Sequence, residues 1–127
     1  MTTDNKQIIE TAMKDLFVLG DVDAAARHLR DDFVDHGPGI VTASRAGWVD
    51  AVRKLPVGEM KLEVRRVLAD GPYVIMLSRR WLPWEQRWIA VFDLWRFEDG
   101  MIIEHGEVLQ TIEDTGREVG ADSLMPW

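Results

Sequence analysis

The sequence contains no cysteine, one tyrosine and no long run of apolar residues. Without cysteine the chain cannot form a disulfide, a thiolate nucleophile or a cysteine-ligated zinc or iron–sulfur site. Its polar N-terminus and lack of a long apolar run argue against a signal peptide or membrane span, so we expect a cytoplasmic protein with no membrane partner. Its chemistry is therefore expected to use carboxylates, imidazoles, hydroxyls or arginines.

Basic residues are also in the minority, with 15 Lys+Arg against 22 Asp+Glu and a formal net charge of −7. Phosphate backbones are bound by clustered Lys and Arg, so we expect no nucleic-acid partner. Linker-like stretches and internal repeats are lacking as well. The length of 127 residues, 46% of them hydrophobic, predicts one globular domain over residues 1–127.

The first part of the chain has the apolar spacing of helices. Residues 8–17 form one apolar helical face, and shorter helices are predicted over 22–29 and 44–55. Between these two, an extended piece over 33–36 ends in a Gly-Pro-Gly turn at 37–39. We therefore expect three N-terminal helices.

From residue 61 the apolar period changes to two and β-branched residues accumulate. Strands are predicted over 62–69, 73–82, 87–97 and 101–112. Helices followed by sequential strands predict an α+β fold with a curved antiparallel sheet packed against the helices. Residues 113–127 are interpreted as a tail or as a flap over a pocket.

The hairpin between the last two predicted strands can close in two ways. A two-residue turn at Asp99-Gly100 would turn Asp93 away from His105. A three-residue loop with Gly100 in the left-handed conformation would place Asp93 directly opposite His105. We favour the three-residue loop because it gathers Asp93, His105 and Glu107 on one face. In that register this face carries Val91, Asp93, Trp95, Ile103, His105, Glu107 and Leu109, and the other face carries Phe92, Leu94, Ile102 and Val108.

An apolar concave face with a few convergent polar groups is typical of a small-molecule pocket. Burial in such a face raises the pKa of a carboxylic acid, which suits it to general acid or base catalysis. The alternative interpretation is that Asp93 and His105 form a buried ion pair that only orders the hairpin.

Two segments resemble a known family. Residues 90–110, AVFDLWRFEDGMIIEHGEVLQ, resemble the C-terminal signature of the SnoaL-like polyketide cyclase family in the NTF2-like superfamily, and FVDHGPG at 33–39 is similar to its early His-Asn-Pro-Gly motif. The resemblance implies a cone-shaped α+β fold with a pocket between the curved sheet and the helices. It also implies a homodimer through the outer sheet face, with which the apolar outer residues of the hairpin agree.

The resemblance further implies a function. It suggests a cofactor-independent and metal-free lyase or isomerase acting on a small hydrophobic carbonyl compound. By position the acid/base role falls on Glu107, with His105, Asp93 and His36 as pocket partners. The alternative is a non-catalytic ligand-binding or accessory domain with a similar pocket.

The sequence departs from the family pattern at three motif positions. Gly37, Gly106 and Glu107 stand where the family usually has Asn, Trp and Asp. The longer acid moves the carboxylate by more than about one ångström, a displacement to which catalytic geometry is sensitive.

Other constellations lead to further hypotheses. His36 and His105 with one carboxylate could ligate a metal, although the resembling family needs none. Tyr73 is the one candidate for a tyrosine-based oxyanion hole, which disfavours that mechanism. One inward-pointing arginine among Arg79, Arg80 and Arg87 would suggest a carboxylate-bearing or enolate-forming substrate.

Overall fold

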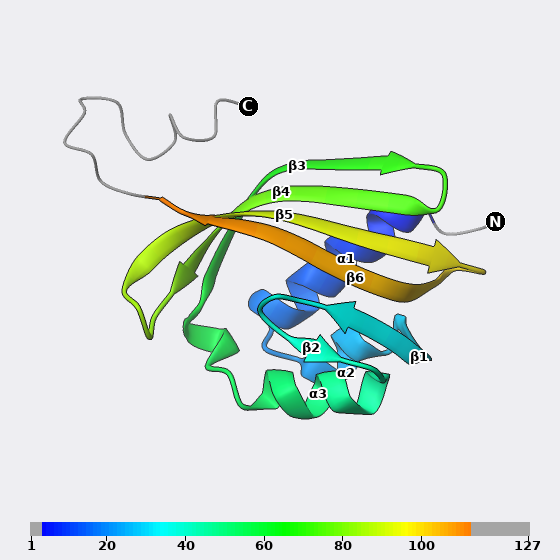
Figure 1. Ribbon diagram of the computed structural model, residues 1–127, viewed down its shortest axis with the longest axis horizontal. Helices are drawn as coiled ribbons and strands as arrows, with labels where there is room; N and C mark the ends of the chain where they lie inside the picture. Colours follow the sequence, from blue (N-terminus) through cyan, green and yellow to red (C-terminus); the bar gives the residue numbers. More distant parts are fainter. Residues whose placement is uncertain (1–3, 113–127) are drawn as a thin grey trace.

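The computed structural model describes residues 4–112 and shows helices covering one face of a curved sheet (Figure 1). Along the chain the elements are α1 (Asn5–Phe17), α2 (Val22–Ala26), β1 (Leu29–His36), β2 (Val41–Thr42), α3 (Arg45–Arg53), a 3-10 turn η1 (Val57–Glu59), β3 (Lys61–Asp70), β4 (Tyr73–Leu82), β5 (Arg87–Glu98) and β6 (Met101–Thr111). The predicted α+β fold is confirmed. The expectation for residues 113–127 lies outside the described residues.

The described strands form one sheet in the order β2-β1-β6-β5-β4-β3. Strands β3 to β6 pair antiparallel, as predicted, but β1 pairs with β6 in parallel. The sheet is therefore mixed, and β1 is longer than the extended piece expected at 33–36. The second helix is correspondingly shorter, because Leu29 belongs to β1 and pairs with Ile102.

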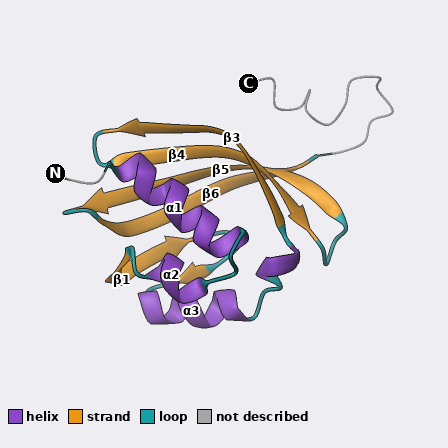
Figure 2. Ribbon diagram, turned by 180° about the vertical axis from the view of Figure 1, so that it is seen from behind, coloured by secondary structure: helices purple, strands orange, loops and turns teal. Residues whose placement is uncertain are grey.

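Each of the three α-helices within residues 4–112 begins at a capping side chain. Asp4, Asp21 and Ser44 accept hydrogen bonds from backbone N–H groups in the first turns of α1, α2 and α3. Seen from behind, α1 lies across the sheet, with α2 and α3 over the β1 end (Figure 2). The main core between these layers contains Ile9, Leu29, Phe33, Met76, Trp95, Phe97 and Ile102. Within residues 4–112 no helix is long and apolar enough to cross a membrane.

The hairpin joining β5 and β6 closes through a two-residue turn, so the predicted three-residue loop is wrong. Glu98 pairs with Met101, and the turn residues Asp99 and Gly100 have φ of 50° and 77°. Two residues with positive φ suit the right-handed twist of the flanking strands, and Asp-Gly is a preferred pair for such turns.

A β-bulge in β6 then returns Asp93, His105 and Glu107 to one common face, as predicted. The register shifts between Arg96 and Phe97, which leaves Ile103 as an extra residue on β6. Beyond the bulge Asp93 pairs with Glu107 and not with His105, two positions from the expected register but on the same face. Below the bulge Ile102 pairs with Phe97 and is 2% exposed in the core, so its predicted place on the outer face is also wrong.

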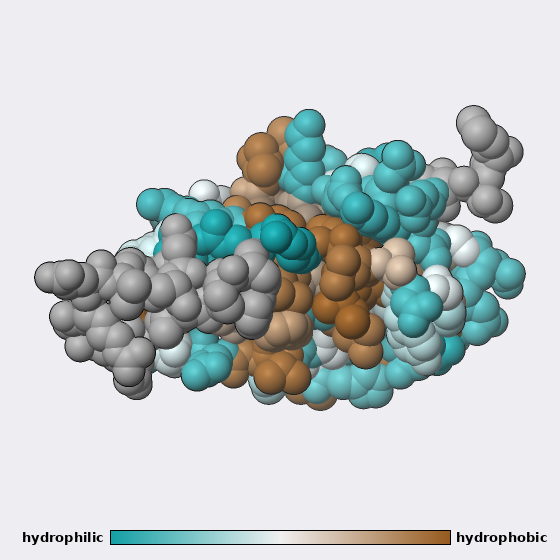
Figure 3. Space-filling model, turned by 90° about the horizontal axis from the view of Figure 1, so that it is seen from above, coloured by the Kyte–Doolittle hydropathy of each residue, from teal (hydrophilic) through white to brown (hydrophobic). Residues whose placement is uncertain are grey.

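The outer face of the sheet exposes several apolar side chains. Seen from the β3 side, brown hydrophobic surface gathers in the middle of the molecule between teal hydrophilic side chains (Figure 3). On β4, β5 and β6 the partly exposed residues of this outer face include Ile75, Phe92, Leu94 and Val108. Apolar clusters of this kind on a protein surface usually mark a contact with another molecule.

We predict that Gly100→Ala lowers the free energy of unfolding by about 1 kcal/mol, because a Cβ disfavours left-handed backbone. Gly58→Ala is the matched control: Gly58 lies in η1 without positive φ, and no atom lies within 4 Å of an added Cβ. Denaturant unfolding of both variants measures the difference. Equal stability of the two variants would contradict the turn assignment.

Candidate active site

A cavity of about 220 Å³ lies between the concave face of the sheet and the helices. Its wall is largely apolar, and includes Leu16, Phe17, Leu55, Met60, Ile89 and Leu109. Five ionisable side chains interrupt this wall, namely Asp35, Arg80, Asp93, His105 and Glu107. An apolar cavity with convergent polar groups matches the pocket expected from the sequence.

His105 on β6 lies at the centre of the polar cluster. Its Nδ1–H donates to Asp35 Oδ1 at 2.9 Å, and its Nε2–H donates to Asp93 Oδ1 at 2.7 Å. Burial by itself lowers the pKa of His105, but the hydrogen bonds to Asp35 and Asp93 and their negative charges outweigh it and raise the pKa to about 9. At neutral pH His105 is therefore an imidazolium with both nitrogens engaged.

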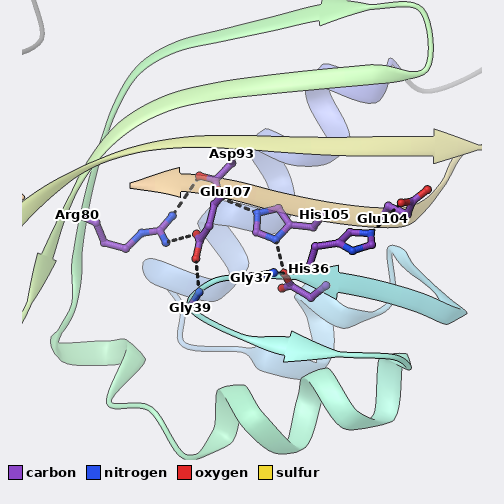
Figure 4. A network of polar contacts seen from close by, with 9 residues as sticks. His36, Gly37, Gly39, Arg80, Asp93, Glu104, His105 and Glu107 are labelled. Carbon is purple, nitrogen blue, oxygen red and sulfur yellow. Dashed lines mark hydrogen bonds and ion pairs between the residues drawn. The ribbon is translucent and has the colours of Figure 1, made fainter. Parts of the chain in front are cut away.

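Arg80 on β4 extends this cluster toward Glu107 (Figure 4). Its Nη2 donates to Asp93 Oδ2 at 3.3 Å, and its Nη1 lies 3.6 Å from Glu107 Oε2. The guanidinium also lies over the ring of Phe17, 5.2 Å from its centroid. Acidic and basic groups therefore alternate from β1 across the sheet to β4.

Glu107 is held by the turn that follows β1. Its Oε1 accepts a hydrogen bond from the Gly39 N–H at 2.9 Å, and its backbone N–H donates to the Gly37 carbonyl at 2.9 Å. A Cβ at position 39 would lie only 2.5 Å from Oε1, so glycine is what permits this approach. The carboxylate therefore has one oxygen fixed by the backbone and the other directed toward Arg80 (Figure 4).

Three of the four predicted site residues come together, and the fourth does not. Asp93, His105 and Glu107 line the cavity. The prediction that His36 is a pocket partner is wrong. Its side chain is 57% exposed, and its Nε2 lies 2.9 Å from Glu104 Oε2, apart from the cluster (Figure 4). Adjacent strand residues point to opposite faces, so Asp35 takes the inward position.

Sequence reasoning missed Asp35 and left the arginine unresolved. Asp35 stands beside His36 in the FVDHGPG segment, but its contact with His105 depends on the parallel pairing of β1 with β6. Of the three arginines considered, Arg80 points inward, while Arg79 pairs with Glu63 and is stacked over Trp88. Because successive side chains of a strand point to opposite faces of the sheet, the sequence could have placed Arg79 and Arg80 on different faces. It could not have indicated which of the two faces inward.

The cluster does not fit a metal site well. Ligand atoms of Asp93, His105 and Glu107 lie within 4.8 Å of one another, but both ring nitrogens of His105 already bind carboxylates. A metal-ligating imidazole needs a free lone pair on one nitrogen. The two-histidine arrangement considered from the sequence is not assembled, because His36 lies beside Glu104. The residues suit proton chemistry better.

Comparison with known proteins agrees with this architecture. Residues 11–105 match the SnoaL-like domain, so the chain belongs to the SnoaL-like family of NTF2-like proteins. No curated protein sequence matches the chain.

Several solved structures share the fold. An NTF2-like protein of unknown function from Cytophaga hutchinsonii has a TM-score of 0.74 and 16% identity, covering 87% of this chain and 93% of its own. A provisionally named ketosteroid isomerase from Kribbella flavida has a TM-score of 0.74 and 19% identity, covering 94% and 86%. An LEH-like epoxide hydrolase of Mycobacterium tuberculosis has a TM-score of 0.71 and 19% identity, covering 86% and 84%. At these identities the likeness establishes the fold alone.

The raised pKa of His105 predicts a pH-dependent stability. The imidazolium pairs stabilise the fold fully below the unfolded pKa of 6.5, and this contribution is lost as the pH rises through about 9. The loss should be on the order of 3 kcal/mol. Unfolding measured from pH 6.5 to 9 should show this decline in the wild type.

Two histidine variants separate this effect from other titrations. His105→Asn should remove the decline, whereas His36→Asn, which changes an exposed histidine outside the cavity, should keep it. NMR titration of the His105 ring in the folded wild type measures the same pKa directly. A His105 that titrates at or below its ordinary value would contradict the assignment.

Proposed function

We propose that the protein is a cofactor-independent lyase or isomerase that moves a proton on a hydrophobic carbonyl compound, with Glu107 as the principal acid/base group. The observation that carries this proposal is the position of the Glu107 carboxylate in the cavity wall. The Gly39 N–H fixes Oε1, which leaves Oε2 to exchange a proton with a bound molecule. General acid–base catalysis requires such a fixed group within reach of the substrate.

Asp93 and His105 act in this proposal as positioning groups. His105 is an imidazolium between two carboxylates, so at neutral pH it has no free nitrogen with which to remove a proton from substrate. Asp93 binds both His105 and Arg80, and it thereby links the buried imidazolium to the group that faces Glu107. The proton-transfer role therefore rests on Glu107.

The apolar wall supports a hydrophobic substrate, and the family supports this class of reaction. A bound carbonyl compound would lose a proton from carbon to Glu107 and regain it at a different carbon in an isomerisation. In a lyase reaction the same proton loss would precede cleavage or closure of a neighbouring bond. The fold likeness to the provisionally named ketosteroid isomerase is consistent with an isomerase.

We expect wild-type protein to accelerate hydrogen–deuterium exchange next to the carbonyl of hydrophobic ketones in D2O. Exchange reports proton removal alone, so it needs no knowledge of the final product. Glu107→Gln should lower the exchange rate by about 10²–10⁴-fold, because an amide cannot take up the proton. Mass spectrometry of a ketone panel, preselected by thermal shift, measures the rates.

Glu104→Gln is the matched control for this experiment. Glu104 lies on the same strand but pairs with Arg96 and His36 outside the cavity, so its loss should leave exchange unchanged. Full exchange by Glu107→Gln would refute the assignment of Glu107. Ligands that bind without any exchange in the wild type would instead support the non-catalytic binding domain.

We also propose a homodimer that forms through the outer sheet face. Phe92 and Leu94 are both 43% exposed there, and Val108 is 70% exposed. Leaving this apolar surface in water is unfavourable, and a second copy of the same face would cover it.

Light scattering should therefore give a dimer for the wild type at micromolar concentration, and Phe92→Glu should shift it to monomer. Leu19→Glu is the control, because Leu19 is 63% exposed but follows α1 on the helical layer. Leu19→Glu should stay dimeric. A monomeric wild type would overturn the proposal.

A further inference from the structure

Resting on the proposed function, we infer that Arg80 binds the oxyanion that forms on the substrate, and that the cavity takes neutral enolisable carbonyl compounds and not carboxylates. The inference comes from the position of Arg80 between two acids at the cavity wall. Only 13% of its side chain is exposed, and it lies next to the proposed acid/base group. Arg80 would thus be a catalytic residue alongside Glu107.

The guanidinium of Arg80 is not saturated by its protein partners. It makes one hydrogen bond of 3.3 Å to Asp93 and a longer ion pair of 3.6 Å to Glu107. Its buried Nε has no hydrogen-bond partner within residues 4–112. A guanidinium carries five N–H donors, so Arg80 retains donors for a ligand oxygen. Its contact with the Phe17 ring holds it in place from the helical side.

The charges around Arg80 select the kind of ligand. The cavity wall carries three carboxyl groups, those of Asp35, Asp93 and Glu107, against the guanidinium of Arg80 and the imidazolium of His105. A carboxylate ligand would add a negative charge where acids already outnumber bases, and such unpaired charge is costly in a buried site. A neutral carbonyl compound adds none.

Proton transfer then moves a charge within the cavity without adding one. The C–H bond next to the carbonyl breaks, and its proton goes to Glu107 Oε2. The C–H electron pair forms a C=C bond while the C=O π pair moves onto the oxygen, so Glu107 loses the negative charge that the enolate oxygen gains. Arg80 Nη1 faces Oε2, and it is therefore free to turn from the neutralised acid to the new oxyanion.

Binding of a coloured phenol tests this inference without a turnover assay. Para-nitrophenolate resembles an enolate in charge and geometry, and Glu107→Gln reproduces the neutral, protonated acid. We expect Glu107→Gln to bind para-nitrophenolate about tenfold to a hundredfold more tightly than the wild type, the range for a hydrogen bond to a charged group. Para-nitroanisole has the same ring but cannot ionise, and its affinity should stay unchanged. Absorbance titration and calorimetry measure both.

Combining the variant with changes at two adjacent arginines isolates Arg80. Arg80→Gln with Glu107→Gln should lose the gain in phenolate affinity, whereas Arg79→Gln with Glu107→Gln should keep it. Arg79 is the matched control because it lies on the same strand but pairs with Glu63. Arg80→Lys keeps the positive charge at this position, so combined with Glu107→Gln it should retain part of the gain. This variant keeps the test possible if the protein carrying Arg80→Gln fails to fold.

Four results would overturn the inference. Two concern the variants: no gain in phenolate affinity in Glu107→Gln, or a gain that survives the addition of Arg80→Gln. The third is failure of both probes to bind. The fourth is tighter binding of para-nitrobenzoate than of para-nitroanisole by the wild type, which would indicate a carboxylate site. None of these measurements requires turnover, so a binding protein without exchange activity could still show the Arg80 effect, and the two proposals fail separately.

Discussion

The buried imidazolium of His105 between Asp35 and Asp93 is the interaction on which the rest of the site depends. Paired charges are tolerated inside a protein, but removing one partner leaves an uncompensated charge that costs several kcal/mol. Because Asp35, His105 and Asp93 lie on β1, β6 and β5, their pairing requires all three strands to keep their register. Asp93 uses its second oxygen to hold Arg80, and Arg80 faces Glu107. Structural stability and the proposed chemistry thus share one set of charges.

The parallel pairing of β1 with β6 gives this arrangement its two faces. Inward, it places Asp35 against His105 and brings the turn after β1 to the Glu107 carboxylate. His36 and Glu104 are the strand neighbours of Asp35 and His105. Since successive side chains of a strand point to opposite faces, these two lie on the outer face of the sheet. The inner face is a small apolar cavity with a charged centre, and the outer face is a largely apolar surface over β4, β5 and β6. One strand pair therefore separates the proposed site for a small molecule from the proposed surface for a second copy of the chain.

The hairpin shows why a correct face can follow from a wrong turn. The expected three-residue loop and the observed two-residue turn differ by one residue, which alone would invert every side chain beyond the turn. The bulge at Ile103 shifts the register by one further residue, so Asp93, His105 and Glu107 still share the concave face, two positions from the expected register. The Asp99-Gly100 pair favours a two-residue turn, and the period-two alternation indicates which residues of each strand share a face, but neither local pattern predicts how the two strands align. The bulge that reconciles them depends on the packing of Ile102 and Phe97 in the core.

The sequence by itself determined the order of the main helices and strands, the family signature and the common face of His105 and Glu107, because these follow from local periodicity and short motifs. That Asp93 joins this face depends on the bulge at Ile103. Tertiary structure decided that Asp35 and not His36 meets His105, and that Arg80 enters the cavity. It also decided that the Gly39 N–H holds Glu107. These contacts join segments up to 70 residues apart. They depend on which strands pair and in which register, and that choice is made by burial of the whole core and not by any local pattern.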